Sequence, residues 1–156
     1  MTDMLVRLYA LPDLDAKARM DPIGVVVRRA LPPERRLIVR WVAEHFSDIW
    51  ASECEVAMSS LPVTLWIAQR GEALLGFACH DATAKGLFGP TGVLESERHQ
   101  GIGEALLLTT LAGMREAGYP YAVIGDPGPM DFYRRCVDAI EIPDSSPGLY
   151  RGLLRQ

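Results

Sequence analysis

The feature that most constrains this fold lies within residues 86–118, where a strand-like segment, a polar turn with two glycines and a long apolar helix follow one another. The helix is predicted over residues 101–117, because the strong helix formers Ala, Leu, Met, Glu and Arg dominate it. Gly118 stands where a left-handed C-cap is expected. A helix that is apolar on most sides is largely buried, so we expect it to lie against a sheet.

The first turn of this helix predicts an anion-binding site. The first N–H groups of a helix have no partner within it, and the helix dipole adds partial positive charge at that end. Gly101 and Gly103 carry no side chain that would keep an anion away, and Arg98 and Gln100 can add donors from the side. The expected ligand is a phosphate or pyrophosphate. The glycines alone leave a second interpretation open, in which they only start the helix.

Two other phosphate-binding motifs do not fit this turn. A Walker-type loop requires Gly-Lys-Ser/Thr after its glycines, whereas Glu104-Ala105 follows here. The dinucleotide fingerprint requires a third small residue where Leu106 stands.

Residues 98–103, Arg-His-Gln-Gly-Ile-Gly, resemble the R/Q-x-x-G-x-G/A signature of the GNAT-type N-acetyltransferases. The strand ending at Val93 and the later pair Phe132-Tyr133 fall where that family has a strand and a Phe-Tyr pair. The resemblance covers residues 63–139, roughly half of the chain. His99 departs from the family, which often has glycine there; its side chain either crowds the loop or contacts a phosphate.

The resemblance implies a single domain, residues 1–156, with an α/β fold of the α+β type. This fold is a mixed, mostly antiparallel, twisted sheet of about six or seven strands flanked by helices, with a central splayed pair of parallel strands. The pattern agrees, because a helix between strands at residues 86–93 and 121–124 implies a parallel pair with a right-handed crossover. A crevice where two such strands splay is a usual ligand site.

Other predicted elements complete this plan. They are strands at residues 5–11, 24–30, 63–69 and 72–80, helices from Pro32 and from Ser47 to Ser59, a short helix at residues 130–137, and a final hairpin of residues 139–142 and 149–151. In the GNAT-type family the equivalent pair of helices often borders the acceptor site, so the resemblance implies the same here.

The resemblance also implies acetyl-CoA as co-substrate, with its pyrophosphate on the N–H groups of residues 100–104. A backbone N–H near Val93 would polarise the thioester carbonyl, and Leu94 would continue the pairing of this strand with the pantetheine arm. The full predicted set is Val93, Leu94, Arg98, His99, Gln100, Gly101, Ile102, Gly103, Glu104 and Phe132.

Acyl transfer from a thioester to an amine requires proton transfers but no covalent enzyme intermediate. Tyr133 is the predicted proton donor to the leaving thiolate, and the alternative is a core tyrosine with its hydroxyl at the surface. Asp81 is the predicted base, because it follows the strand beneath the expected acceptor site. Glu53 is a more distant candidate, and water is an alternative to both.

The composition limits the classes of partner that we expect this chain to bind. The net charge of −4, from 16 basic and 20 acidic residues, argues against nucleic acid and favours a basic or neutral substrate. No apolar run approaches the ~18 residues of a membrane span, and the N-terminus lacks a signal-peptide pattern, so we expect no membrane and a cytoplasmic location. Cys54, Cys79 and Cys136 lack metal-site spacing, which predicts free buried thiols and no metal.

The leading hypothesis is an N-acetyltransferase that moves an acetyl group from acetyl-CoA to a primary amine of a small molecule or a protein. The alternatives are a non-catalytic acyl-CoA-binding regulatory module and a phosphate-binding fold with unrelated chemistry. Only the leading hypothesis predicts CoA release that depends on an added amine. The sequence does not identify the acceptor amine, the acyl-chain preference or the oligomeric state. A homodimer is one of the oligomeric states that it allows.

Overall fold

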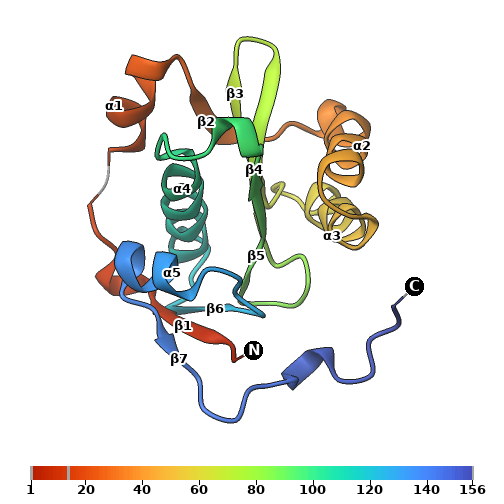
Figure 1. Ribbon diagram of the computed structural model, residues 1–156, viewed down its shortest axis with the longest axis vertical. Helices are drawn as coiled ribbons and strands as arrows, with labels where there is room; N and C mark the ends of the chain where they lie inside the picture. The colour runs from red at the N-terminus through yellow and green to blue at the C-terminus, as the bar shows by residue number, and fades with distance from the viewer. Residues whose placement is uncertain (1, 14, 156) are drawn as a thin grey trace.

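The computed structural model describes residues 2–13 and 15–155, whose strands form one seven-stranded sheet in the order β2-β3-β4-β5-β6-β1-β7. The strands are β1 (Met4–Arg7), β2 (Val26–Arg29), β3 (Leu65–Arg70), β4 (Ala73–His80), β5 (Leu87–Val93), β6 (Tyr121–Ile124) and β7 (Ile140–Glu141). The sheet twists so strongly that β6 and β1 run across the direction of β3 and β4 (Figure 1).

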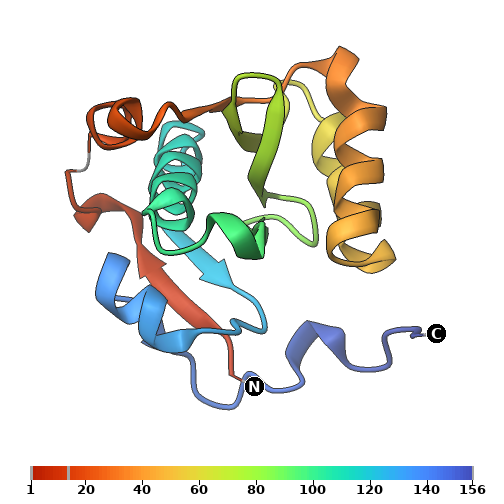
Figure 2. The ribbon, with the colours of Figure 1, turned by 45° about the horizontal axis from the view of Figure 1, so that its top comes forward.

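Helices cover both faces of the sheet. They are α1 (Ala16–Met20), α2 (Arg35–His45), α3 (Asp48–Ser59), α4 (Ile102–Glu116) and α5 (Met130–Val137). α4 lies on one side of β3, β4 and β5, and α2 and α3 lie on the other (Figures 1 and 2). The predicted start of α3 is confirmed, because Ser47 is its N-cap and accepts a hydrogen bond from the N–H of Trp50.

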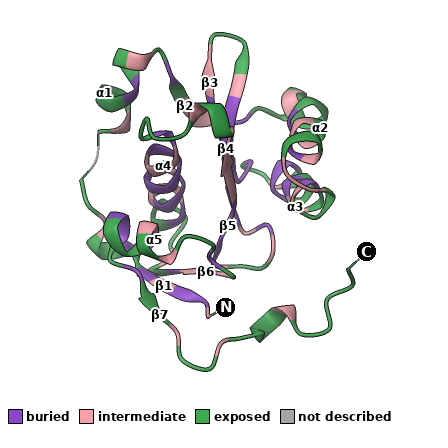
Figure 3. Ribbon diagram, viewed as in Figure 1, coloured by how far each residue is buried: buried purple, intermediate pink, exposed green. Residues whose placement is uncertain are grey.

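Each face of the sheet has its own core. The alternation of β4 shows the division: Phe77 and Cys79 pack towards α2 and α3, whereas Ala78 packs towards α4. α4 buries eight of its residues, which Figure 3 shows as a largely buried helix. The predicted apolar helix therefore packs against the sheet as expected.

The central parallel pair is confirmed. β5 and β6 are parallel, with Leu87 opposite Val123 and Phe88 opposite Ile124. The other strand pairs of the described residues are antiparallel. Since β6 ends at Ile124 while β5 continues to Val93, the two strands separate beyond this short pairing, and the gap opens at their C-terminal ends.

The predicted C-terminal hairpin is wrong. β7 pairs with β1 instead, with Met4 opposite Glu141 and Leu5 opposite Ile140. Residues 149–151 do not form a strand, because Gly148–Tyr150 is one turn of 3₁₀ helix. β1 leaves an edge free beside β6, and the short strand after α5 uses that nearer edge.

Within the described residues, no helix combines the length and the apolar character needed to cross a membrane. No cluster of His, Cys, Asp and Glu in the same residues has the makeup of a metal site. Cys54, Cys79 and Cys136 are free and buried, which confirms the prediction for the thiols.

Candidate active site

The turn before α4 keeps the helix start open. Gly101 is the N-cap in the left-handed conformation, with φ of +83°, and no side chain caps the helix. His99 is also left-handed, with φ of +67°, a conformation that non-glycine residues adopt less often. Along α4, the N–H of Ala105 is the first that donates to a backbone carbonyl; it donates to the carbonyl oxygen of Gly101 over 3.0 Å. The N–H groups before it lie in the first turn, where a helix offers them no carbonyl partner of its own and an anion can accept from them.

The two glycines of the turn have different reasons to be glycine. Gly101 needs its positive φ. Gly103 is helical, and a Cβ built on it would lie 3.8 Å from both Phe132 and Val93, an ordinary contact distance. Packing within the protein therefore does not require glycine at position 103. Its missing side chain leaves space beside the first turn of α4, where an anion would sit.

Hydrogen bonds brace this turn from a distant hairpin. Arg70, at the end of β3, donates to Glu97 Oε2 over 2.9 Å, and Gln100 Nε2 donates to the same oxygen over 2.9 Å. The hydrogen bond from Arg70 lowers the pKa of the Glu97 carboxyl. The Gln100 amide thus holds the turn, whereas it was predicted to reach the ligand. Arg70 was not predicted at all, since its hairpin carries no signal that points to residue 97.

The other predicted charged residues also lie at the turn. Arg98 Nε is 3.4 Å from the carbonyl oxygen of Val93, to which it donates. Glu104, in the first turn of α4, accepts from Arg19 of α1 over 3.4 Å. Ile102 is buried and belongs to the core beneath α4, which leaves its backbone N–H, and not its side chain, to a ligand at the turn.

The backbone N–H groups of Val93 and Leu94, at the end of β5, point in opposite directions. The N–H of Leu94 donates to the carbonyl of Leu75 at 2.9 Å, so it is already paired with the chain of β4. Val93 lies opposite Gly76 in the same antiparallel ladder. Because N–H groups alternate in direction along a strand, the N–H of Val93 points away from β4, towards the gap. The structure therefore leaves Val93, and not Leu94, with a backbone donor facing the splayed side.

A cavity of about 680 Å³ lies beside this gap. Its wall is mostly apolar and comes from the start of α3, from β5, from the chain after β6, from α5 and from residues 149–155. Figures 1 and 2 show the C-terminal segment running below the β4–β5 connection. Side chains from distant parts of the sequence, among them Trp50, Glu53, Thr83, Phe88, Tyr133 and Tyr150, meet in this wall.

Tyr133 is buried in the cavity wall, with 4% of its surface exposed. Its ring packs edge-on against Phe88 of β5, with 6.3 Å between ring centroids. Burial raises the pKa of the Tyr133 phenol to about 12, so the hydroxyl keeps its proton at neutral pH. Its neighbour Phe132 is on another side of α5, next to Gly103.

The structure separates the two carboxylates considered as bases. Asp81, with φ of +54°, lies in the turn after β4. Its carboxylate accepts from the N–H of Gly86 at 2.7 Å and from the hydroxyl of Tyr119 at 3.0 Å, and it contacts His80 Nδ1 at 3.1 Å. It does not line the cavity, and its bonds assign it to holding the turn.

Glu53 lines the cavity from α3. Thr83 Oγ1 donates to Glu53 Oε1, which fixes the carboxylate beside the turn after β4. Burial raises the pKa of the Glu53 carboxyl, and the Thr83 hydrogen bond opposes this shift. The sequence offered Glu53 only as one acidic residue of a helix; its partner Thr83 is 30 positions away.

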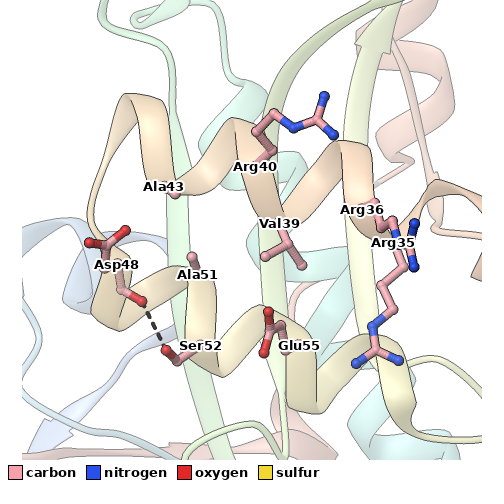
Figure 4. Close-up of a pocket in the computed structure, with 9 residues that line it drawn as sticks. All are labelled: Arg35, Arg36, Val39, Arg40, Ala43, Asp48, Ala51, Ser52 and Glu55. Carbon is pink, nitrogen blue, oxygen red and sulfur yellow. Dashed lines mark hydrogen bonds between the residues drawn. The ribbon is translucent and has the colours of Figure 1, made fainter.

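A second hollow, of about 480 Å³, lies between α2 and α3 (Figure 4). Three arginines, Arg35, Arg36 and Arg40, contribute to its wall. It contains no residue of β5 or α5. The cavity beside β5 is therefore the better candidate for the active site, because strand edge, buried phenol and carboxylate meet there.

Comparisons with solved structures identify the fold of this chain. A GCN5-related glucosamine N-acetyltransferase region of a fungal multi-domain GH3 β-N-acetylglucosaminidase aligns over 90% of this chain and 19% of its own, with a TM-score of 0.73 and 16% identity. A GCN5-related N-acetyltransferase from Sphaerobacter thermophilus aligns over 90% of this chain and 48% of its own, with a TM-score of 0.66 and 21% identity. This chain thus spans less than half of either protein.

A third structure has nearly the length of the aligned region. A GNAT family acetyltransferase from Brucella melitensis in complex with acetyl-CoA aligns over 76% of this chain and 91% of its own, with a TM-score of 0.53 and 20% identity. No protein-family model matches the sequence, and no curated protein matches it either. The likeness lies in the arrangement of the strands and helices, and on that basis this chain has the GNAT-type N-acetyltransferase fold.

Proposed function

We propose that this chain transfers an acetyl group from acetyl-CoA to a primary amine, by direct attack and without a covalent enzyme intermediate. One observation carries the proposal: a Cβ built on Gly103 would lie 3.8 Å from side-chain atoms of both Val93 and Phe132. The open helix start, the free edge of β5 and the helix that holds Tyr133 therefore meet at one place. A phosphate site next to a strand edge suits a ligand with a pyrophosphate and an amide-containing arm.

The residues present fit such a ligand. The pyrophosphate binds the N–H groups of the first turn of α4, and the side-chain-free position 103 gives it room. The N–H of Val93 donates to the pantetheine arm or to the thioester carbonyl, where negative charge develops. Phe132 contacts the arm from α5, and His99 and Arg98 flank the phosphates.

Two side chains act on the reacting groups in this proposal, Glu53 as a proton acceptor and Tyr133 as a hydrogen-bond donor. Glu53 accepts a proton from the ammonium, and the free amine attacks the carbonyl carbon as the C–S bond breaks. The amine loses a second proton after the C–N bond forms; one proton reaches the thiolate through water, and the other reaches solvent. With a pKa of about 12, Tyr133 is a weaker acid than a thiol, near 8.5, so its hydroxyl stabilises the departing sulfur as a hydrogen-bond donor.

The second candidate function is a non-catalytic acyl-CoA-binding module, which requires the same phosphate turn. The carboxylate of Glu53 in the cavity wall favours the transferase, because a binding module has no use for a proton acceptor there. Both functions predict binding of acetyl-CoA in a calorimetric titration. The deciding experiment is a screen of amines for CoA release from acetyl-CoA; binding without release by any amine favours the module.

A further inference from the structure

We propose that residues 148–155 form a wall of the acceptor site and restrict this chain to small primary amines with an apolar body. The inference rests on the proposed function, because acyl transfer is what gives the cavity an acceptor. Leu149, Tyr150, Leu153 and Arg155 all line the cavity, together with the start of α3. The segment thus closes a side of the cavity that the sheet and helices leave open.

The wall is held in place on both sides of Gly148. Before it, the N–H of Asp3 donates to Ser145 Oγ over 2.8 Å, and the N–H of Ile142 donates to the carbonyl of Asp3 over 2.8 Å. After it, Tyr150 packs against Gly125 so closely that a Cβ at position 125 would collide with its hydroxyl. The segment is therefore fixed to β1 and to the end of β6, next to the gap between β5 and β6.

The cavity lining indicates an acceptor with an apolar body. Ile49, Leu149 and Leu153 are 48%, 51% and 47% exposed, and all three line this one cavity. Trp50 adds an aromatic surface. Half-exposed aliphatic side chains that gather at one cavity are typical of a surface that a ligand covers.

The charges of the lining indicate a basic acceptor. Two carboxylates, Glu53 and Asp126, belong to it, and Arg155 is the one basic side chain among its described residues. A primary amine is an ammonium ion at neutral pH and is attracted to a partly buried carboxylate. Glu53 keeps one oxygen beyond the one that accepts from Thr83, so it can pair with that ammonium.

The position of the wall disfavours polypeptide acceptors. A lysine of a protein must bring its main chain to the cavity, and Leu149, Tyr150 and Leu153 already occupy one side of it. A free amine requires no such space. The volume of about 680 Å³ is that of an ordinary small-molecule site, and the thioester end of the co-substrate must share it.

The test compares four acceptors with the intact chain and acetyl-CoA: phenethylamine, glucosamine, spermidine and a lysine peptide blocked at its N-terminus. We expect kcat/KM for phenethylamine to exceed the other three by roughly tenfold or more, as the burial of one apolar side group allows. Tyr150→Ala and Leu153→Ala should each raise KM for phenethylamine by roughly tenfold. The KM for acetyl-CoA should stay unchanged in both.

The matched control is Leu154→Ala. Leu154 is adjacent to Leu153 but is 93% exposed and does not line the cavity, so its removal should change no KM. Tyr150→Phe keeps the aromatic ring at position 150 and should keep the preference for phenethylamine. It provides a variant of Tyr150 with a smaller change than Tyr150→Ala.

Two results would overturn the inference while the proposed function stands. In the first, the parent chain acetylates the peptide, glucosamine or spermidine as fast as phenethylamine. In the second, Leu153→Ala and Leu154→Ala give the same KM for phenethylamine. The proposed function is contradicted instead if the parent chain binds acetyl-CoA but releases no CoA with the four amines and none with a wider set of amines.

Discussion

The proposed phosphate turn before α4 and the proposed acceptor cavity beside β5 are neighbours, but they are built in opposite ways. The turn and the start of α4 come from one continuous stretch, residues 93–104, with Arg70 as a brace from outside. The cavity takes its wall from residues between 47 and 155 that meet only after folding. A site made of backbone N–H groups therefore leaves a local pattern in the sequence, whereas a site made of side chains from distant segments does not.

The largest expected effect tests the cavity. Tyr133→Phe removes only a hydroxyl in its wall and should lower kcat for a working amine by ~10²–10³-fold, the usual loss when one hydrogen-bond donor to a developing negative charge is removed. The affinity for acetyl-CoA should change little, because the hydroxyl acts mainly as the thiolate departs. Steady-state kinetics beside a calorimetric titration separates the two quantities.

The control for this variant is Tyr9→Phe, which removes the hydroxyl of a tyrosine that is 63% exposed and does not line the cavity. It should leave kcat unchanged. If Tyr133→Phe keeps more than half of the parental turnover while chemistry limits the rate, Tyr133 has no part in the reaction.

The next effect tests the phosphate turn. Gly103→Val places a branched side chain beside the first turn of α4 and should weaken acetyl-CoA binding by roughly 10–100-fold, the loss expected when charge-assisted hydrogen bonds are blocked. The measurement is the dissociation constant by calorimetry. Ala112→Val adds a valine to the same helix away from the turn and controls for a branched side chain elsewhere in α4; equal binding by both variants would mean that the phosphate site lies elsewhere.

A third prediction separates glycines required by packing from glycines that serve a ligand. A Cβ on Gly92 would lie 2.6 Å from the ring of Phe46, so Gly92→Ala should lower the free energy of unfolding by about 1–3 kcal/mol through overpacking. Gly103→Ala meets ordinary contacts at 3.8 Å and should not destabilise the fold. Urea denaturation of the two variants provides the comparison, and equal midpoints for them would refute it.

The smallest effect concerns pH. Glu53 must be ionised to accept a proton, so activity should rise with pH through its pKa. Because burial raises that pKa above the ordinary 4.5, the acid limb of kcat/KM should lie above that value. Glu53→Gln should remove this limb, whereas Asp81→Asn should leave its position unchanged, since Asp81 is outside the cavity. A limb that persists in Glu53→Gln assigns it to another group.

The same profile carries information about Tyr133. A phenol whose pKa is raised to about 12 remains protonated at all pH values below that range. Its hydrogen bond to the departing sulfur is therefore available from neutral to moderately alkaline pH, and no alkaline fall in activity below about pH 10 should come from this residue.

The sequence predicted the central unit of the fold because its signals are local. The apolar pattern of α4, the short strand β6 and the glycines at positions 101 and 103 lie within one stretch, and a crossover helix leaves one common handedness. The prediction failed at the C-terminus, where residues 139–142 and 149–151 looked like a hairpin. The partner of β7 is β1, more than 130 residues away, and no local pattern announces such a pairing.

The candidate site divides along the same line. Sequence alone predicted the glycine turn at the start of α4, because its pattern is local, and the resemblance to the GNAT-type family supplied the predictions for Val93 and Tyr133. Tertiary structure decided that the Gln100 amide bonds to Glu97, that Asp81 holds a turn, and that Glu53 enters the cavity. Those outcomes depend on which distant side chain arrives next to each group, and distances of that kind are set only when the sheet and its two helical layers pack together.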